Sequence, residues 1–562
     1  MNNWKEKVVY QIWPRSFFDS NGDGVGDLSG IIQKLDHIKA LGADLVWLSP
    51  IYASPNHDYG YDISDYTAIH PDFGTMEDFE KLIKEADRRG LGIVMDLVAN
   101  HTSDEHAWFQ KALADKTSIY RDYYIFRPGK NGKEPNNWLS FFGGSSWTRD
   151  NVSGEYYLTS FTPHQCDLNW ENPAVRREIY DMMKFWLDKG VKGFRMDVIN
   201  TIAKAPGLPD KDPHKKGYQF PRELVINREP SHEYIREMNR EVLSRYNCFS
   251  VGEGVLTGTE DVINYTNPNR NELMMMFQFD LHSLGCGPLG KFDFRKLYHW
   301  TIPEFIRVVD KWQLRMQQGG GWLGNYLSNH DQPRHISRFG DDEKFRRECA
   351  KAFCLLNLTL RGTPFIYQGE ECGMTNSSFK KEDWRDYEAI NDYKVLQSMM
   401  HLPRRLAERV INGMTRDHAR TPVHWNAGKN AGFTSGAPWI KINPNYKQIN
   451  IEDDLKSPES IIRFYKEAIA FRKANPVLTY GDYLPVAREN RRVISYIRED
   501  DKDRILVLIN LTNKNAPISL DKIAVTDTAA LIGTHGRRPL LERMVLQPYE
   551  GRAYKLLGGK AL

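Results

Sequence analysis

Three carboxylates lie at the ends of short segments that predict strands. Asp197 follows GFRM, Glu253 follows FSVG and Asp331 follows LSNH. Carboxylates without a cluster of His and Cys ligands suit glycoside hydrolysis, in which one acid stays ionised and another is held protonated for the leaving oxygen. A retaining enzyme needs this pair about 5–5.5 Å apart. These residues therefore point to glycosidic bond cleavage.

The neighbours of each carboxylate indicate its role. Arg195 lies two residues before Asp197, and a nearby guanidinium keeps a carboxylate ionised, as a nucleophile requires. Glu253 lies between two glycines after an apolar segment, where burial favours the protonated form of an acid. Asp331 is left as a third carboxylate that grips the substrate. A polar residue that caps a loop is the alternative for any one of them, but it explains the group poorly.

Eight short apolar or β-branched segments must position these residues, and helical patterns such as 31–42 and 76–90 lie between several of them. Parallel strands covered by helices have this pattern, and eight units favour a (β/α)8 barrel over an open sheet. Barrel enzymes carry their chemistry at the carboxyl ends of the strands. The predicted strands are 8–12, 45–51, 92–100, 193–199, 249–253, 275–279, 323–329 and 362–371.

Two regions interrupt the alternation. An aromatic, Gly- and Asn-rich stretch after the third strand predicts a small inserted domain at 105–171, in which Trp138, Phe141, Phe142 and Trp147 either line an entrance or pack a core. Segments 493–499, 504–512 and 552–557 predict antiparallel strands. We expect a barrel over 1–104 and 172–480, the insertion, and a C-terminal antiparallel β-sandwich domain over 481–562.

The composition excludes several function classes. The 562 residues hold 76 Lys and Arg against 73 Asp and Glu, a net charge of +3 that gives no support to nucleic-acid binding. No long apolar stretch predicts a signal peptide or a membrane span. The six cysteines lack CxxC spacing, which favours reduced thiols in a cytoplasmic protein. We expect a small oligosaccharide substrate, no organic cofactor, no nucleic-acid or membrane partner, and a monomer or weak homo-oligomer.

Longer motifs around the carboxylates are similar to the four signature segments of the α-amylase family of glycoside hydrolases: DLVANHTSDEH (96–106), GFRMDVIN (193–200), VGEG (251–254) and LSNHDQPR (327–334). The chain most resembles the oligo-1,6-glucosidase and α-glucosidase branch, through segments 12–28, 57–66, 165–170, 362–371 and 416–425. The resemblance covers essentially the whole chain.

The resemblance implies Asp197 as nucleophile, Glu253 as acid/base and Asp331 as transition-state stabiliser. It further implies a closed pocket for the non-reducing glucose, with Arg420 as an alternative to Arg416. The implied substrate-binding residues are Asp58, Tyr61, His101, Gln165, Arg195, Val198, His330 and Arg416.

The expected activity is that of a retaining exo-acting α-glucosidase on isomaltose and short isomalto-oligosaccharides. Val198 resembles the residue after the nucleophile in α-1,6-cleaving members. The alternatives are an α-1,4-glucosidase, or a sucrose isomerase or transglucosylase that uses the same glucosyl-enzyme. Segment 290–300 lacks the Arg-Leu-Asp-Arg-like run of the isomerases, which disfavours that reading. A non-catalytic scaffold relative is a remote alternative, because such proteins lose the carboxylates.

A loop near the N-terminus has the spacing of a calcium site. Asp19, Asn21, Asp23, Val25 and Asp27 alternate along it, with Gly24 at the turn. These are the first nine positions of a calcium loop, in which the seventh ligand is a backbone carbonyl. The bidentate Glu at position twelve is missing, so the loop is not an EF-hand, and an Asx-rich turn is the alternative. We expect a structural Ca²⁺ ion here.

Overall fold

The computed structural model describes residues 3–288, 290–295, 297–521, 523 and 530–556. Eight parallel strands form one sheet in the order β13-β12-β11-β5-β2-β1-β15-β14, and a parallel bridge between Met276 and Leu323 brings its two ends together. All eight predicted strands are present, and the predicted barrel is confirmed. The strands are β1 Val9–Ile12, β2 Leu45–Leu48, β5 Gly92–Val98, β11 Gly193–Asp197, β12 Phe249–Glu253, β13 Met275–Phe277, β14 Gly324–Asn325 and β15 Thr363–Tyr367.

Alternation along the strands separates the barrel interior from the layer under the helices. Val94, Val251 and Phe277 belong to an inner cluster, whereas Met95 and Phe194 pack in the larger outer core. Side chains in a strand alternate with a period of two, so Asp96 lies on the same face of β5 as Val94, and Glu253 lies on the same face of β12 as Val251. The charged strand ends therefore gather inside one end of the barrel.

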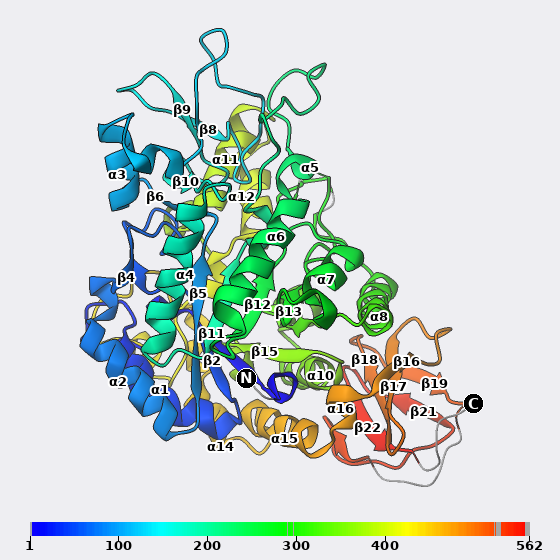
Figure 1. The fold of residues 1–562 in the computed structure, drawn as a ribbon. Helices are drawn as coiled ribbons and strands as arrows, with labels where there is room; N and C mark the ends of the chain where they lie inside the picture. The colour runs from blue at the N-terminus through cyan, green and yellow to red at the C-terminus, as the bar shows by residue number, and fades with distance from the viewer. Residues whose placement is uncertain (1–2, 289, 296, 522, 524–529, 557–562) are drawn as a thin grey trace.

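Helices surround the barrel (Figure 1). Their ends show ordinary capping: Asp27 caps the first of them by accepting from the Gly30 amide, and Thr75 and Asp78 form a capping box. The main covering helices are α1 Leu28–Leu41, α2 Met76–Arg88, α4 Pro173–Asp188, α6 Glu229–Met238, α7 Thr259–Thr266, α8 Ile302–Gly319, α10 Arg346–Thr359 and α15 Ile461–Ala474.

The chain between β5 and β11 leaves the barrel, as predicted. It forms a three-stranded antiparallel sheet and a two-stranded pair, and Figure 1 shows this part projecting beyond one end of the barrel. Its bounds, predicted at 105 and 171, stay a prediction. Its elements are β6 His101–Ser103, α3 Ala107–Ala114, β7 Phe126–Arg127, β8 Trp147–Arg149, β9 Tyr156–Leu158 and β10 Gln165–Asp167.

A second excursion, which the sequence did not predict, follows β15. Helices α11 (Tyr387–Ser398) and α12 (Arg404–Met414) pack on each other around their own apolar cluster. They lie at the same end of the barrel as the insertion (Figure 1), where the Asn391 side chain donates to the Phe142 carbonyl at 2.5 Å. Segments that are distant in sequence therefore lie together at this end of the barrel.

The C-terminal part is the predicted β-sandwich. A five-stranded antiparallel sheet, in the order β16-β17-β18-β22-β20, faces the pair β19-β21 across a shared apolar cluster. Residue 557 of the predicted last strand lies outside the described residues. The strands are β16 Asp482–Pro485, β17 Val493–Glu499, β18 Arg504–Asn510, β19 Ala516–Ser519, β20 Ile532–Gly533, β21 Arg543–Leu546 and β22 Gly551–Lys555.

Within the described part of the chain, no helix combines the length and the apolar character that a membrane crossing requires.

Candidate active site

A cavity of about 250 Å³ lies at the carboxyl end of the barrel strands, and nearly all the predicted site residues line it. Arg195 and His330 are not in its wall, but both are buried and contact residues that are. A larger cavity of about 640 Å³ beside the insertion contains none of the predicted site residues. The predicted residues in the wall are Asp58, Tyr61, His101, Gln165, Asp197, Val198, Glu253, Asp331 and Arg416.

Arg195 links the two carboxylates predicted to react. Its guanidinium donates to Asp197 at 2.7 Å and to Asp96 at 2.8 Å, and it also donates to Glu253. Strand register explains the arrangement: Arg195 on β11 lies beside Asp96 on β5 and beside Val251 on β12, two residues before Glu253. The Arg195 guanidinium therefore stabilises negative charge on both Asp197 and Glu253, so its position alone does not determine which of the two is ionised.

The carboxylates of Asp197 and Glu253 interact directly in a buried setting. Burial raises the pKa of Asp197 well above its usual range; Arg195 opposes this, and the negative charge of Glu253 adds to it. Two neighbouring carboxylates titrate as a pair, because ionising one disfavours ionising the other. Burial and Glu253 thus favour the protonated form of Asp197, and Arg195 favours the ionised form that a nucleophile requires.

Asp331 has the opposite environment. It pairs with His330 at 3.0 Å, Arg420 at 3.1 Å and Arg416 at 3.5 Å. Burial alone would raise the pKa of Asp331, but His330 and the two arginines hold it well below its usual range. Asp331 is therefore a permanent negative charge in the wall of the cavity.

The structure also separates the two candidate arginines. Arg416 lies in the cavity wall and joins Asp331 to Asp58, whose oxygen accepts from it at 3.3 Å. Arg420 lies behind the wall, where it donates to the His330 carbonyl and to Asp331. A ligand in the cavity therefore meets Arg416 first.

His330 is fixed between aromatic rings. Its imidazole stacks on Trp13, with 5.2 Å between ring centroids, and on Tyr61, with 5.5 Å. The Tyr61 hydroxyl lies 2.7 Å from one ring nitrogen, and the Gln11 amide nitrogen lies 2.8 Å from the other. His330 thereby holds both Tyr61 and Asp331 in place.

Uncharged hydrogen-bonding groups lie next to Asp58 in the cavity wall. Burial lowers the pKa of His101 to about 4, so its imidazole is neutral at physiological pH. The Gln165 amide lies 3.0 Å from that imidazole and donates to Asp58 at 3.5 Å. Burial raises the pKa of Asp58 to about 6, although Arg416 lowers it. Such groups suit the hydroxyls of a neutral sugar.

Val198, which directly follows Asp197, has an unusual backbone. Its φ is 35° and its ψ is 39°, in the left-handed region that β-branched residues avoid. Its amide donates to Glu253 at 3.2 Å. Val198 thus connects the two predicted catalytic carboxylates through its backbone while its side chain lines the cavity.

Several cavity residues were missing from the sequence prediction. Asp96 is not in the cavity wall, but it is buried and accepts from Arg195 at 2.8 Å, a role that was not predicted from the sequence. Lys291 and Glu388 form an ion pair at 2.5 Å in the wall, from the loop after β13 and from α11. The four aromatic residues predicted either to line an entrance or to pack a core have different positions. Phe141 and Phe142 line the cavity, whereas Trp138 and Trp147 pack in the core of the insertion.

The predicted calcium loop lies away from the cavity. Asp19 and Asp27 are buried and accept hydrogen bonds from loop amides, and no ion pair to either appears among the described residues. Asn21 and Asp23 are exposed. An all-oxygen donor set with two buried carboxylates that lack a cationic partner fits a hard cation.

Known proteins are similar to this chain over nearly its whole length. It is 49% identical to an oligo-1,6-glucosidase of Parageobacillus thermoglucosidasius, over 98% of this chain and 99% of that protein. The trehalose-6-phosphate hydrolase of Bacillus licheniformis superposes with a TM-score of 0.93 at 43% identity, covering 98% and 99% of the two chains. The isomaltulose synthase of Erwinia rhapontici superposes at 0.92 with 41% identity, covering 98% of each chain.

A family model described as the alpha amylase catalytic domain matches residues 11–481, which begin within β1 and include the other seven barrel strands and every cavity residue described above. The chain therefore belongs to the α-amylase family of glycoside hydrolases.

Proposed function

We propose that the protein is a retaining, exo-acting α-glucosidase that releases glucose from the non-reducing end of isomaltose and short isomalto-oligosaccharides. The observation that carries this proposal is the Arg195 bridge between Asp197 and Glu253 in the wall of one cavity. Two carboxyls on adjacent strands that share one cation support the close arrangement that a retaining mechanism requires.

The reaction has two steps. Asp197 attacks the anomeric carbon while Glu253 gives its proton to the glycosidic oxygen, so the bond to the leaving sugar breaks as the bond to Asp197 forms. Glu253, now ionised, then takes a proton from water, and the resulting hydroxide displaces Asp197. The product is α-glucose, and both carboxyls return to their starting state.

The cavity supports cleavage from the chain end. At about 250 Å³ it is smaller than the about 300 Å³ at which pockets for drug-sized ligands begin. Asp58, Arg416 and Asp331 form a chain of charged groups in the cavity wall, and Gln165 and His101 lie next to Asp58 as neutral hydrogen-bonding partners. A terminal glucose fits such a site better than an internal segment of a long chain.

The α-1,6 preference is supported by Val198 and by the 49% identity to an oligo-1,6-glucosidase. The structure is also similar to those of a trehalose-6-phosphate hydrolase and an isomaltulose synthase. The alternative activities are therefore hydrolysis of another glucoside, or transfer of the glucosyl group to another sugar. Transfer to a second sugar needs only that a hydroxyl replace water in the second step. An α-1,4 preference would leave the mechanism unchanged.

A substrate panel tests the proposal. Isomaltose, maltose, sucrose, trehalose and trehalose 6-phosphate are incubated separately with the enzyme, and NMR follows the first anomer released. We expect α-glucose from isomaltose at the highest kcat/KM. Release of β-glucose, or hydrolysis that survives Asp197→Asn unchanged, would contradict the mechanism. Isomaltulose formed from sucrose, or faster cleavage of trehalose 6-phosphate, would favour a neighbour's activity instead.

We further propose that loop 19–27 holds a structural Ca²⁺ ion through side-chain oxygens of Asp19, Asn21, Asp23 and Asp27 and the Val25 carbonyl. The carboxylates of Asp19 and Asp27 support this site, because both are buried and accept hydrogen bonds only from neutral donors among the described residues. The ion would tie the loop to the start of α1, which Asp27 caps. We also propose a cytoplasmic location, supported by six free cysteines of which five are buried.

A further inference from the structure

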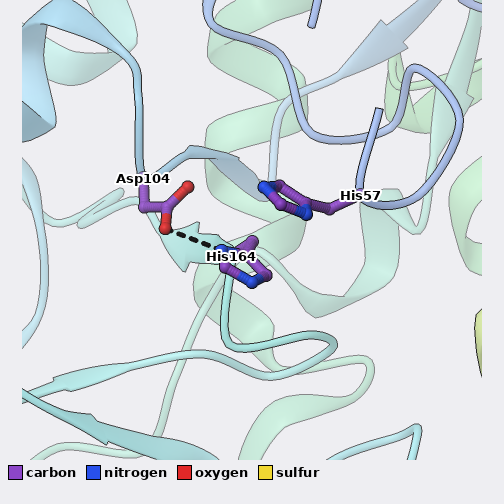
Figure 2. Close-up of side chains that lie close together, drawn as sticks. All are labelled: His57, Asp104 and His164. Atoms are coloured by element: carbon purple, nitrogen blue, oxygen red, sulfur yellow. Dashed lines mark hydrogen bonds and ion pairs between the residues drawn. The ribbon is translucent and has the colours of Figure 1, made fainter. Parts of the chain in front are cut away.

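Two histidines and an aspartate that the proposed mechanism does not use lie together where the insertion meets the loop that carries His57 (Figure 2). They are His57, Asp104 and His164, and one ligand atom from each lies within 4.8 Å of the others. The imidazoles stack with 3.7 Å between centroids and 8° between planes. The Asp104 carboxylate lies 2.8 Å from Nδ1 of His164.

We propose that these three side chains form a binding site for one borderline divalent metal ion, of which Zn²⁺ is the representative. Imidazole and carboxylate are ordinary zinc ligands, at about 2.0–2.2 Å. Three protein ligands leave a fourth tetrahedral position for water. Hard cations such as Ca²⁺ prefer all-oxygen sites, so this site and loop 19–27 select different ions.

The backbones that carry the three ligands are already fixed. Asp104 follows β6 and His164 precedes β10, two strands that pair in register, and the Asp104 amide donates to the His164 carbonyl at 3.1 Å. The loop that carries His57 is held by Asp62, a buried acid that accepts from the amides of His57 and Asp58. Only side-chain rotations are therefore needed to bring the ligands onto an ion.

Those rotations have a definite direction. Two parallel stacked rings cannot both direct an in-plane nitrogen lone pair at the same ion, so one imidazole must tilt out of the stack. Tetrahedral ligands at about 2.1 Å are about 3.4 Å apart. Asp104 and His164 are already closer than that, so an ion bound at Nδ1 would replace their direct contact.

Access and position also suit an ion taken from solution. His57 is exposed and the other two ligands are partly exposed, so hydrated metal can enter without opening the fold. The ion would clamp the loop before β4 (Asp65–Ile69) to the β6–β10 pair. Because the unfolded chain lacks this arrangement, occupancy stabilises the folded state in proportion to metal concentration.

Metal titration of the purified full-length protein tests the proposal. Isothermal calorimetry with Zn²⁺ should show one equivalent that His57→Ala, Asp104→Asn and His164→Ala each weaken at least about tenfold. The same additions should raise the melting temperature of the wild type but not of His164→Ala. His214→Ala, which removes an exposed histidine elsewhere, is the matched control and should behave as wild type.

A spectroscopic arm identifies the ligands. Co²⁺ added in place of zinc should give the visible d–d absorption of a tetrahedral site in the wild type, and this band should disappear in His164→Ala. Hydrolysis of p-nitrophenyl α-glucoside without added metal shows that each variant is folded. Unchanged zinc affinity in folded His57→Ala and His164→Ala, or an equal loss in His214→Ala, would overturn the proposal.

Discussion

The guanidinium of Arg195 donates to Asp197 and to Glu253 at once. A single buried cation therefore stabilises negative charge on whichever carboxyl is ionised as the proton moves between substrate and enzyme. This requires a planar group with several fixed donors, which arginine has and lysine lacks. The arrangement leads to a prediction about the pH profile.

Arg195→Lys should lower kcat/KM by about 10²-fold or more, because one ammonium cannot replace a forked contact to three carboxylates. Arg195 lowers the pKa of Asp197, so a weaker cation lets that pKa rise. The nucleophile reacts when ionised, and the acid limb of the kcat/KM profile should therefore move to higher pH. Arg176→Lys, at the ion pair with Glu237, is the control. A loss of rate with an unshifted limb would contradict the electrostatic role.

Glu253→Gln should separate the two steps of the reaction. The kcat for isomaltose should fall about 10²–10⁴-fold, because its leaving group is a sugar that departs poorly unless an acid protonates the glycosidic oxygen. p-Nitrophenyl α-glucoside needs no acid, so stopped-flow absorbance should show a burst of nitrophenol followed by slow turnover, since water still lacks a base. Asp197→Asn should show no burst. A Glu253→Gln enzyme without a burst would exclude accumulation of the glucosyl-enzyme.

The barrel and its reactive carboxylates could be predicted because both are local in sequence. Asp197 and Glu253 end strands whose apolar alternation fixes the face on which they lie. Glu388 could not be placed in this way: it lies on α11 and reaches the cavity only through tertiary packing against Lys291 and the insertion. The same limit explains why Phe142 could not be distinguished from a core residue before the fold was known.

Val198→Thr should change linkage preference while leaving the fold intact, because threonine has nearly the same shape. Val198 lines the cavity, and its amide donates to Glu253. We expect the ratio of kcat/KM for isomaltose to that for maltose to fall by about tenfold, the effect of one well-packed apolar contact. Parallel initial rates on the two disaccharides measure the ratio. An unchanged ratio would assign the preference to other residues of the wall.

Glu370→Gln should change how stability depends on pH. Burial raises the pKa of Glu370 to about 8, and the Tyr465 hydroxyl donates to it at 2.9 Å. In the unfolded chain its pKa is about 4.3, so between about pH 4 and pH 8 the folded state binds the proton and the unfolded state does not. The contribution of Glu370 to the free energy of unfolding is fully present below about pH 4, and it decreases as the pH rises from about 4 to about 8.

The neutral amide removes this loss. Urea unfolding at about pH 5 and about pH 8 should show a smaller fall in the free energy of unfolding for Glu370→Gln than for the wild type. Other buried acids titrate in both proteins, so the difference between the two slopes isolates this carboxyl. Equal slopes would mean that Glu370 is ionised in the folded protein.

Loop 19–27 allows a calcium test that leaves its turns intact. Asp23 accepts from the Val25 amide at 2.8 Å through one carboxylate oxygen, and Asp23→Asn keeps an acceptor there while removing the charge. Millimolar Ca²⁺ should raise the melting temperature of the wild type, and EGTA should reverse the rise, because an ion bound only by the folded state adds RT ln(1 + [Ca²⁺]/Kd) to its stability. The rise should be smaller in Asp23→Asn. Asp27 is the poorer choice of variant, since its loss also uncaps α1. Equal responses of the two proteins to calcium and EGTA would show that the loop is an Asx turn without a metal.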